Sequence, residues 1–420
     1  MSDTTGAAVD AAVDAAVQGA GAAADGAEAA GSWSRAGRHA GIAGAAIGVV
    51  AAGAAAGVAI ERLTVGRGMR RRARLALDAA GPYGTLRGTP GRAVAEDGTE
   101  LYYEVDEPGE TPGAVPGARR KRLRGVLGRR GTAPTVVFCH GYCLNQDAWH
   151  FQRAALRGVV RTVHWDQRSH GRSERGRAQR AGAEPVTIDL LGRDLKAVLD
   201  AAVPEGPVVL VGHSMGGMTV MALAEQYPEY VAERVTGVAL VGTSAGRLSE
   251  VAFGLPSLGV KAFHRFAPGL LKAMGAQSEL VERGRRATAD LFAGLVKRYS
   301  FGTPKDVDPA VARFAERMIE ATPIDVVAEF FPAFAVHDKT EALAAYDGVP
   351  ALVMSGDRDL ITPSDHSGAI ADLLPGAESL CVPGAGHLIM LERPELVSER
   401  LAALVERAAS TARGTRSERA

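Results

Sequence analysis

Cysteine is scarce in this chain: Cys139, Cys143 and Cys381 are the three cysteines among 420 residues. An odd number without regular spacing excludes a scaffold held by disulfides and suits a reducing compartment. No nearby pair of Cys or His residues completes the spacing of a zinc site. We therefore interpret the cysteines as packing residues and expect no metal site.

A net charge is also lacking, because 48 Lys and Arg residues balance 48 Asp and Glu residues. The balance gives no support to a nucleic-acid partner, and no aromatic residues alternate with the arginines to stack on bases. The charge is uneven, however: residues 1–34 carry five acidic side chains and no basic ones. Since this region also has few large apolar residues, we predict a disordered tail over 1–39.

The longest uncharged run is AGIAGAAIGVVAAGAAAGVAI, residues 40–60. At about 1.5 Å per residue, such a helix just spans the hydrocarbon core of a bilayer, and its glycine spacing allows helices to approach closely in lipid. We predict a transmembrane or membrane-associated helix over 40–61, followed by a basic linker over 62–90. The arginines of that linker place the main domain at the cytoplasmic face of the membrane. Alanine and glycine are only weakly hydrophobic, so a soluble or disordered segment in a cytoplasmic protein, or a cleaved signal, stays open.

A second basic stretch, GARRKRLRGVLGRRG, occupies residues 117–131. Prolines and glycines surround it, which predicts a loop insertion at 107–133. A solvated loop is the plain interpretation. The alternative is contact with anionic lipid headgroups, which attract such clusters.

Short apolar segments alternate with helical patterns through the rest of the chain. TVVFCHG (135–141), PVVLVG (207–212), GVALVGT (237–243) and PALVMSG (350–356) have the composition of buried strands. Between about 247 and 345 this rhythm stops and helical spacing takes over. We predict an α/β fold with a mostly parallel, doubly wound β-sheet. Its core comprises residues 91–246 and 346–408, separated by a helical cap at 247–345 and followed by a flexible tail at 409–420.

The segment GHSMGG, residues 212–217, lies between a predicted strand and a predicted helix. Gly212 and Gly216 flank Ser214 in the pattern Gly-x-Ser-x-Gly, which is typical of a nucleophile elbow. The serine must adopt a strained backbone conformation for its hydroxyl to project from the sheet, and the two glycines relieve crowding at the turn. Ser214 is therefore the candidate nucleophile.

These motifs resemble the α/β-hydrolase family, in its serine-nucleophile branch of esterases and lipases, over roughly residues 92–408. HGYCLNQDAWHFQ from His140 is similar to the family's oxyanion loop. DQRSHGRSE from Asp166 is similar to a family motif in which Ser169 replaces the usual glycine. SGDRDLITP (355–363) resembles the acid loop, and VPGAGHLIMLERPE (382–395) resembles the histidine loop.

The resemblance and the chemistry of the residues together predict a catalytic triad. A serine hydroxyl needs a base, for which His387 is the best candidate, and the base needs a carboxylate to orient it. We expect that carboxylate to be Asp359, with Asp357 as its rival. The backbone N–H groups of Tyr142 and Met215 are the expected donors to the oxyanion.

We accordingly expect a cofactor-free serine hydrolase that cleaves a carboxylic ester through an acyl-serine intermediate. Phenylalanines and leucines of the predicted cap favour an apolar or lipid-like acyl group. Four alternatives stay open: a thioesterase or acyltransferase, a cofactor-free haloperoxidase or perhydrolase, an amidase or peptidase, and a non-catalytic binding protein. The natural acyl and leaving groups, the oligomeric state and the pathway are not encoded in these motifs.

Overall fold

The computed structural model describes residues 83–109, 133–251 and 289–417, together with the isolated positions 76, 269, 273 and 277. The predicted tail over 1–39, the predicted membrane helix over 40–61 and the basic stretch over 117–131 lie outside these residues. Within the described ranges, no helix has the length and apolar character needed to cross a membrane.

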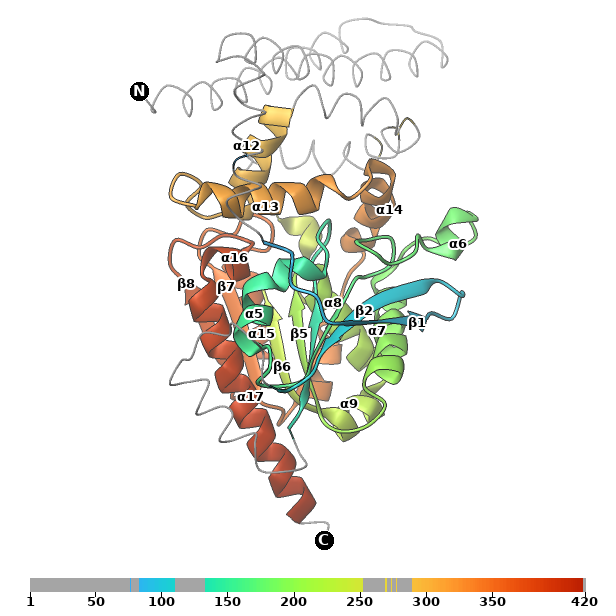
Figure 1. Ribbon diagram of the computed structural model, residues 1–420, viewed down its shortest axis with the longest axis vertical. Helices are drawn as coiled ribbons and strands as arrows, with labels where there is room; N and C mark the ends of the chain where they lie inside the picture. Colours follow the sequence, from blue (N-terminus) through green and yellow to red (C-terminus); the bar gives the residue numbers. More distant parts are fainter. Residues whose placement is uncertain are drawn as a thin grey trace, which may run out of the picture.

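The core is a mixed sheet of eight strands, in the order β1-β2-β4-β3-β5-β6-β7-β8 (Figure 1). Strand β2 pairs antiparallel with β1 and β4, and all the other pairs are parallel. The predicted α/β fold with a mostly parallel sheet is therefore confirmed. The strands are β1 (Thr89–Val94), β2 (Glu100–Asp106), β3 (Thr135–Cys139), β4 (Thr162–Trp165), β5 (Val208–His213), β6 (Val235–Val241), β7 (Ala351–Gly356) and β8 (Glu378–Val382).

Helices cover both faces of this sheet. The core helices are α5 (His150–Leu156), α7 (Ile188–Ala202), α8 (Met215–Gln226), α9 (Pro228–Arg234), α15 (Ser364–Asp372), α16 (Ile389–Glu392) and α17 (Pro394–Ser417). Shorter elements are η1 (Gln146–Trp149), α6 (Arg177–Arg180), η2 (Leu248–Glu250) and η3 (Glu341–Tyr346). Helix α17 continues into the range that we expected to be a flexible tail.

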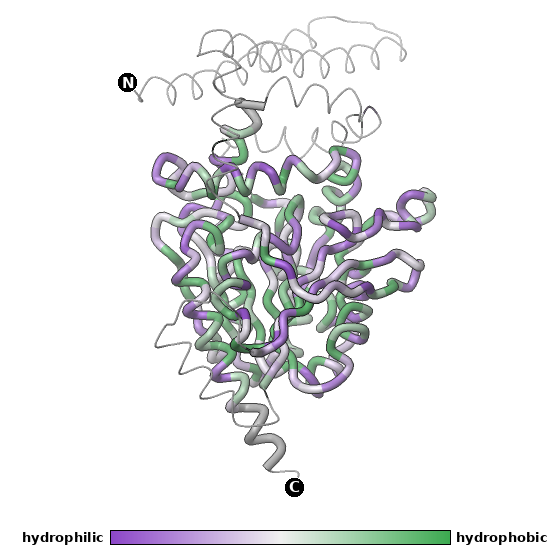
Figure 2. The backbone as a smooth tube through the Cα atoms, viewed as in Figure 1, coloured by the Kyte–Doolittle hydropathy of each residue, from purple (hydrophilic) through white to green (hydrophobic). Residues whose placement is uncertain are grey.

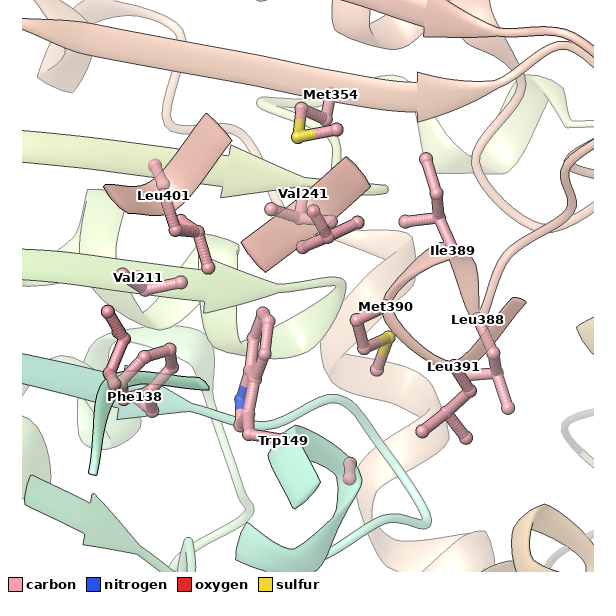
Figure 3. Packing of buried hydrophobic residues seen from close by; sticks show 14 of the residues in the cluster. Phe138, Trp149, Val211, Val241, Met354, Leu388, Ile389, Met390, Leu391 and Leu401 are labelled. Atoms are coloured by element: carbon pink, nitrogen blue, oxygen red, sulfur yellow. The ribbon is translucent and has the colours of Figure 1, made fainter. Parts of the chain in front are cut away.

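Side chains of β5 alternate between two apolar clusters, as the two-residue period of a strand requires. Val208 and Leu210 pack in the cluster that contains residues of α7 and α8. Val209 and Val211 pack in the opposite cluster, which contains residues of α5 and α17. Figure 3 shows part of the latter cluster: Phe138, Val211, Val241 and Met354 from neighbouring strands, with Trp149 and Leu401 against them. Hydropathy follows the same plan, since the central strands are mainly hydrophobic and hydrophilic segments gather at the rim (Figure 2).

Three α-helices of the described residues between β6 and β7 lie over one end of the sheet (Figure 1). They are α12 (Ala289–Ser300), α13 (Pro309–Glu320) and α14 (Ile324–Ala335). Val326 and Phe330 of α14 pack against Met215 and Met218, at the start of α8. Helix α14 therefore lies directly over the turn that carries Ser214.

The element η3 covers the last residues of the predicted cap range and the first residue of the predicted core, and its Leu343 is already buried in the cluster of the strands. Tyr346 of η3 is buried in the same cluster as the strands, and its hydroxyl donates a hydrogen bond to the carbonyl of Val220 on α8. The segment Glu341–Tyr346 thus packs on the core helix rather than with α12–α14.

The cysteines differ in their surroundings. Cys139 is buried and its Sγ accepts a hydrogen bond from the Trp165 indole, and burial raises the pKa of its thiol to about 12. Cys143 is half-buried. Cys381 is exposed on β8, where alternate side chains face outward, so our packing interpretation is wrong for this residue.

Candidate active site

Ser214 occupies the turn between β5 and α8 with φ 52° and ψ −121°. A positive φ is costly for a residue with a side chain and is retained where surrounding structure enforces it. Here the Ser214 N–H donates to Val241 O at 3.0 Å, and Ser214 O accepts a hydrogen bond from Thr243 Oγ1 at 2.7 Å. The predicted strained conformation of the serine is therefore present.

Glycines make this turn sterically possible. A Cβ atom on Gly212 would lie 2.5 Å from the carbonyl oxygen of Gly216, and one on Gly216 would lie 2.3 Å from that of Cys139. Gly217 is equally constrained, because a Cβ there would lie 2.6 Å from Thr243 Oγ1. Gly217 belongs to the same motif, but the pattern Gly-x-Ser-x-Gly includes only Gly212 and Gly216, so the requirement for the third glycine was not predicted.

His387 and Asp359 form a buried hydrogen-bonded pair, with His387 Nδ1 2.8 Å from Asp359 Oδ2. Asp359 Oδ1 accepts the N–H groups of Ile361 at 2.8 Å and Thr362 at 2.9 Å. The Thr362 hydroxyl donates to Oδ2 at 2.9 Å. Asp357 does not take part: it is exposed, and its carboxylate accepts the N–H of Gly384. The structure thus pairs His387 with the residue that we expected and not with its rival.

Electrostatics keep Asp359 ionised. Burial alone would raise the pKa of its carboxyl group, but the His387 ring and the N–H groups of Thr362 and Ile361 outweigh burial and lower the pKa. An ionised carboxylate only accepts hydrogen bonds, so His387 carries its proton on Nδ1. In the neutral form of this tautomer, Nε2 is the ring nitrogen that accepts a proton, as a general base must.

His213 connects the nucleophile turn to the histidine loop. Its Nε2 lies 2.9 Å from the carbonyl oxygen of His387, and the two rings are 4.8 Å apart between centroids. Burial and the neighbouring His387 lower the pKa of His213 to about 3, so this ring is neutral. The Ser214 hydroxyl and the His387 ring, both within the described residues, are not hydrogen-bonded to each other. Catalytic pairs of this kind often tighten only when substrate binds.

The expected oxyanion donors belong to two segments next to the serine. Gly141, which precedes Tyr142, is so close that a Cβ on it would lie 3.1 Å from Ser214 Cβ. Met215 is the first residue of α8, where N–H groups have no partner within the helix. Among the described residues, neither the Tyr142 N–H nor the Met215 N–H donates a hydrogen bond.

The Tyr142 side chain has a contact that the motif did not reveal. Its hydroxyl donates a hydrogen bond to the carbonyl of Val327 on α14, and its ring packs 5.0 Å from that of Phe334 and 6.2 Å from that of Phe330. The oxyanion loop is therefore attached to the cap helix. Sequence could not have shown this, because 185 positions separate Tyr142 from Val327.

Two other histidines of the motifs hold loops through hydrogen bonds. His140 accepts the N–H of Gln167 at 2.9 Å, and burial lowers its pKa to about 3. His170 accepts the N–H of Cys143 at 3.3 Å, and burial lowers its pKa to about 4. Both rings are neutral, and their hydrogen bonds connect the segment that begins at His140 to residues 167–170.

Ser169 occupies the position where the resembled motif has glycine, and it adopts φ 63°. Glycine reaches this region without strain, whereas serine does not. The Ser169 hydroxyl accepts the N–H of Gly176 at 3.1 Å, which partly offsets that strain.

A family model described as alpha/beta hydrolase fold matches residues 134–394, more than half of the chain. The chain therefore belongs to the alpha/beta hydrolase family. The matched range includes the elbow, the oxyanion loop and the loops that carry Asp359 and His387.

Individual relatives cover several activities. The non-heme haloperoxidase of Rhodococcus erythropolis is 29% identical over 317 residues, which cover 74% of this chain and 98% of that protein. The sn-1-specific diacylglycerol lipase ABHD11 of Mus musculus is 27% identical over 276 residues, which cover 64% of this chain and 80% of that protein. A thermophilic esterase from Thermogutta terrifontis has a TM-score of 0.54 at 22% identity and covers 76% of this chain and 99% of that chain. The esterase likeness shows the fold, and the family with its lipase relative supports a hydrolase.

Proposed function

We propose that this protein is a serine hydrolase that cleaves a carboxylic ester through an acyl-serine intermediate. The observation that carries the proposal is the buried His387–Asp359 pair next to the strained turn of Ser214. This arrangement supplies a nucleophile, a base held in the correct tautomer and a carboxylate that stabilises the base once it is charged.

The reaction follows from these roles. Ser214 Oγ attacks the carbonyl carbon of the ester while His387 Nε2 takes the hydroxyl proton. The N–H groups of Tyr142 and Met215 donate to the oxygen that becomes negative. His387 then gives its proton to the departing alcohol, which leaves the acyl group on Ser214. Water, deprotonated by His387, attacks the acyl-serine and releases the acid.

The surroundings of the turn favour an apolar acyl group. Met215, Met218 and Phe330 belong to one apolar cluster at the start of α8, with Phe334 and Tyr142 packed against it. Apolar side chains of this kind pair with an apolar acyl chain better than with a polar one. The lipase relative is consistent with this substrate class.

Chromogenic acyl esters of increasing chain length test the proposal. We expect the wild type to hydrolyse them and Ser214→Ala to lose at least about 10³-fold in kcat, because the nucleophile is gone. Ser398→Ala is the matched control, since Ser398 only hydrogen-bonds the backbone of its own helix α17. Equal turnover by wild type and Ser214→Ala would reject the acyl-serine mechanism.

A second candidate, peracid formation, is favoured by the haloperoxidase relative. The same acyl-serine would react with hydrogen peroxide instead of water and release a peracid, which oxidises bromide outside the protein. Bromination of a phenol in the presence of acetate and hydrogen peroxide measures this activity. Ester hydrolysis without bromination would favour the hydrolase.

Membrane contact through residues 40–60 and 117–131 stays a prediction, because both segments lie outside the described residues. Cell fractionation tests it. If the full-length chain and residues 75–420 are equally soluble, the segment over 40–60 is no anchor.

A further inference from the structure

Glu392, at the end of α16, lies five residues after His387 and has no part in the mechanism above. Its Oε2 accepts the N–H of Gly386 at 2.7 Å and the N–H of Gly302 at 3.2 Å. Its Oε1 accepts the N–H of Thr303 at 3.3 Å. One carboxylate therefore joins the residue before His387 to the segment that follows the cap helix α12.

The two joined segments are in close backbone contact. Leu388 N donates to Ser300 O at 2.8 Å. A Cβ on Gly302 would lie 2.5 Å from the carbonyl carbon of Ala385, and one on Gly386 would lie 2.4 Å from Gly302 N. Only glycine permits such an approach, so residues 300–303 and 385–388 pack as one unit. Glu392 accepts hydrogen bonds from both segments of this unit.

A carboxylate suits this position because both of its oxygens only accept hydrogen bonds. Hydrogen bonds to a charged acceptor are also stronger than those between neutral groups. Glutamine would present an NH₂ group to at least one of the backbone N–H groups. That N–H would lose its acceptor and face a second donor.

We propose that Glu392 is a positioning residue for the candidate active site, which couples the cap segment 300–303 to the loop that carries His387. The proposal rests on the esterase function proposed above. Glu392 holds the Gly386 N–H and thereby the backbone of His387, so that the ring keeps its hydrogen bond to Asp359 next to the turn of Ser214. A displacement of about 1 Å in such a group can cost on the order of 100-fold in rate.

The test compares Glu392→Gln with the wild type on a chromogenic ester. We expect kcat to fall by about 10- to 100-fold and KM to change less than threefold, because Glu392 positions the base and does not touch substrate. Glu392→Asp retains the charge with a shorter reach and should recover part of kcat. Glu395→Gln is the matched control, since Glu395 is an exposed carboxylate three residues away.

A second control variant distinguishes loss of kcat through misplacement of His387 from loss of kcat through lower overall stability. Val397→Ala removes buried apolar contacts on α17 but none of the hydrogen bonds of Glu392, and it should retain kcat even where its loss of Tm equals that of Glu392→Gln. If kcat of Glu392→Gln stays within twofold of the wild type, or if Val397→Ala loses as much, the proposal is overturned.

Amide hydrogen exchange tests the coupling between residues 300–303 and 385–388 without an assay of enzyme activity. In Glu392→Gln we expect faster exchange in both 300–303 and 385–388, and not in the strands. Unchanged exchange in either segment overturns the coupling. A wild type that hydrolyses no ester would instead overturn the proposed function, and the exchange result would still decide whether Glu392 joins the two segments.

Discussion

Replacing Asp359 by asparagine changes one carboxylate oxygen into an NH₂ group, and the structure dictates which one. Oδ1 accepts two backbone N–H groups, from Ile361 and Thr362, so the amide oxygen must stay at that position. The NH₂ group is then placed at Oδ2, 2.8 Å from His387 Nδ1. It donates to Nδ1, which forces the histidine proton onto Nε2. In that tautomer His387 cannot accept the Ser214 proton.

The magnitude follows from the role of the tautomer. Loss of the orienting carboxylate in serine hydrolases of this kind costs about 10⁴-fold in kcat, which corresponds to about 5 kcal/mol of transition-state stabilisation. Steady-state hydrolysis of a chromogenic ester at neutral pH measures it. KM should change little, since Asp359 is buried behind the histidine ring and away from substrate.

Asp357→Asn is the matched control, because it makes the same chemical change two residues away on a carboxylate that only accepts the Gly384 N–H. We expect its kcat to stay within about threefold of the wild type. If Asp359→Asn retains more than a tenth of the wild-type kcat, or if Asp357→Asn loses as much, the assignment of the acid is wrong.

Three further predictions concern stability. Arg168→Leu leaves the buried carboxylate of Asp194 without the guanidinium that binds it at 2.5 and 2.6 Å, so the free energy of unfolding in urea should fall by about 3–5 kcal/mol; a loss below 1 kcal/mol would contradict this. Gly216→Ala brings a Cβ to 2.3 Å from Cys139 O and should cost about 1–3 kcal/mol and abolish hydrolysis, whereas an active, equally stable variant would refute the steric account. The pKa of Asp359 is lowered in the folded protein, so its ionised carboxylate stabilises the fold. This contribution to the free energy of unfolding is complete above about pH 4 and is lost as the pH falls through the folded-state pKa. The difference in the free energy of unfolding between the wild type and Asp359→Asn should therefore decrease as the pH falls below about 4. A difference that stays constant from pH 7 to pH 3 would contradict this prediction.

The candidate catalytic residues could be predicted from the sequence because they lie in short motifs. Ser214 and His387 were identifiable because glycine turns follow buried strands, and the ends of parallel strands meet at one edge of a sheet. Asp359 was separable from Asp357 only by resemblance. The structure shows the physical difference between the two residues. The N–H groups of Ile361 and Thr362 hold the Asp359 carboxylate in place, whereas the Asp357 carboxylate is exposed.

Contacts between distant segments could not be predicted. Glu392 accepts N–H groups from residues about ninety positions earlier, and the Tyr142 hydroxyl reaches a carbonyl of the cap. Neither contact leaves a pattern along the chain, because backbone N–H and C=O groups are the same in every residue. Leu343 likewise gave no sign that it packs in the cluster of the strands rather than in the cap.

The most direct test of the central claim is covalent labelling with an alkyl fluorophosphonate, followed by peptide mass spectrometry. The phosphonyl group reacts with a serine only where a base removes its proton and donors hold the developing oxyanion. We predict one modified residue, Ser214, with labelling lost in His387→Ala and slowed by about 10³-fold or more in Asp359→Asn. Label on another serine, or equal labelling of wild type and His387→Ala, would contradict the account.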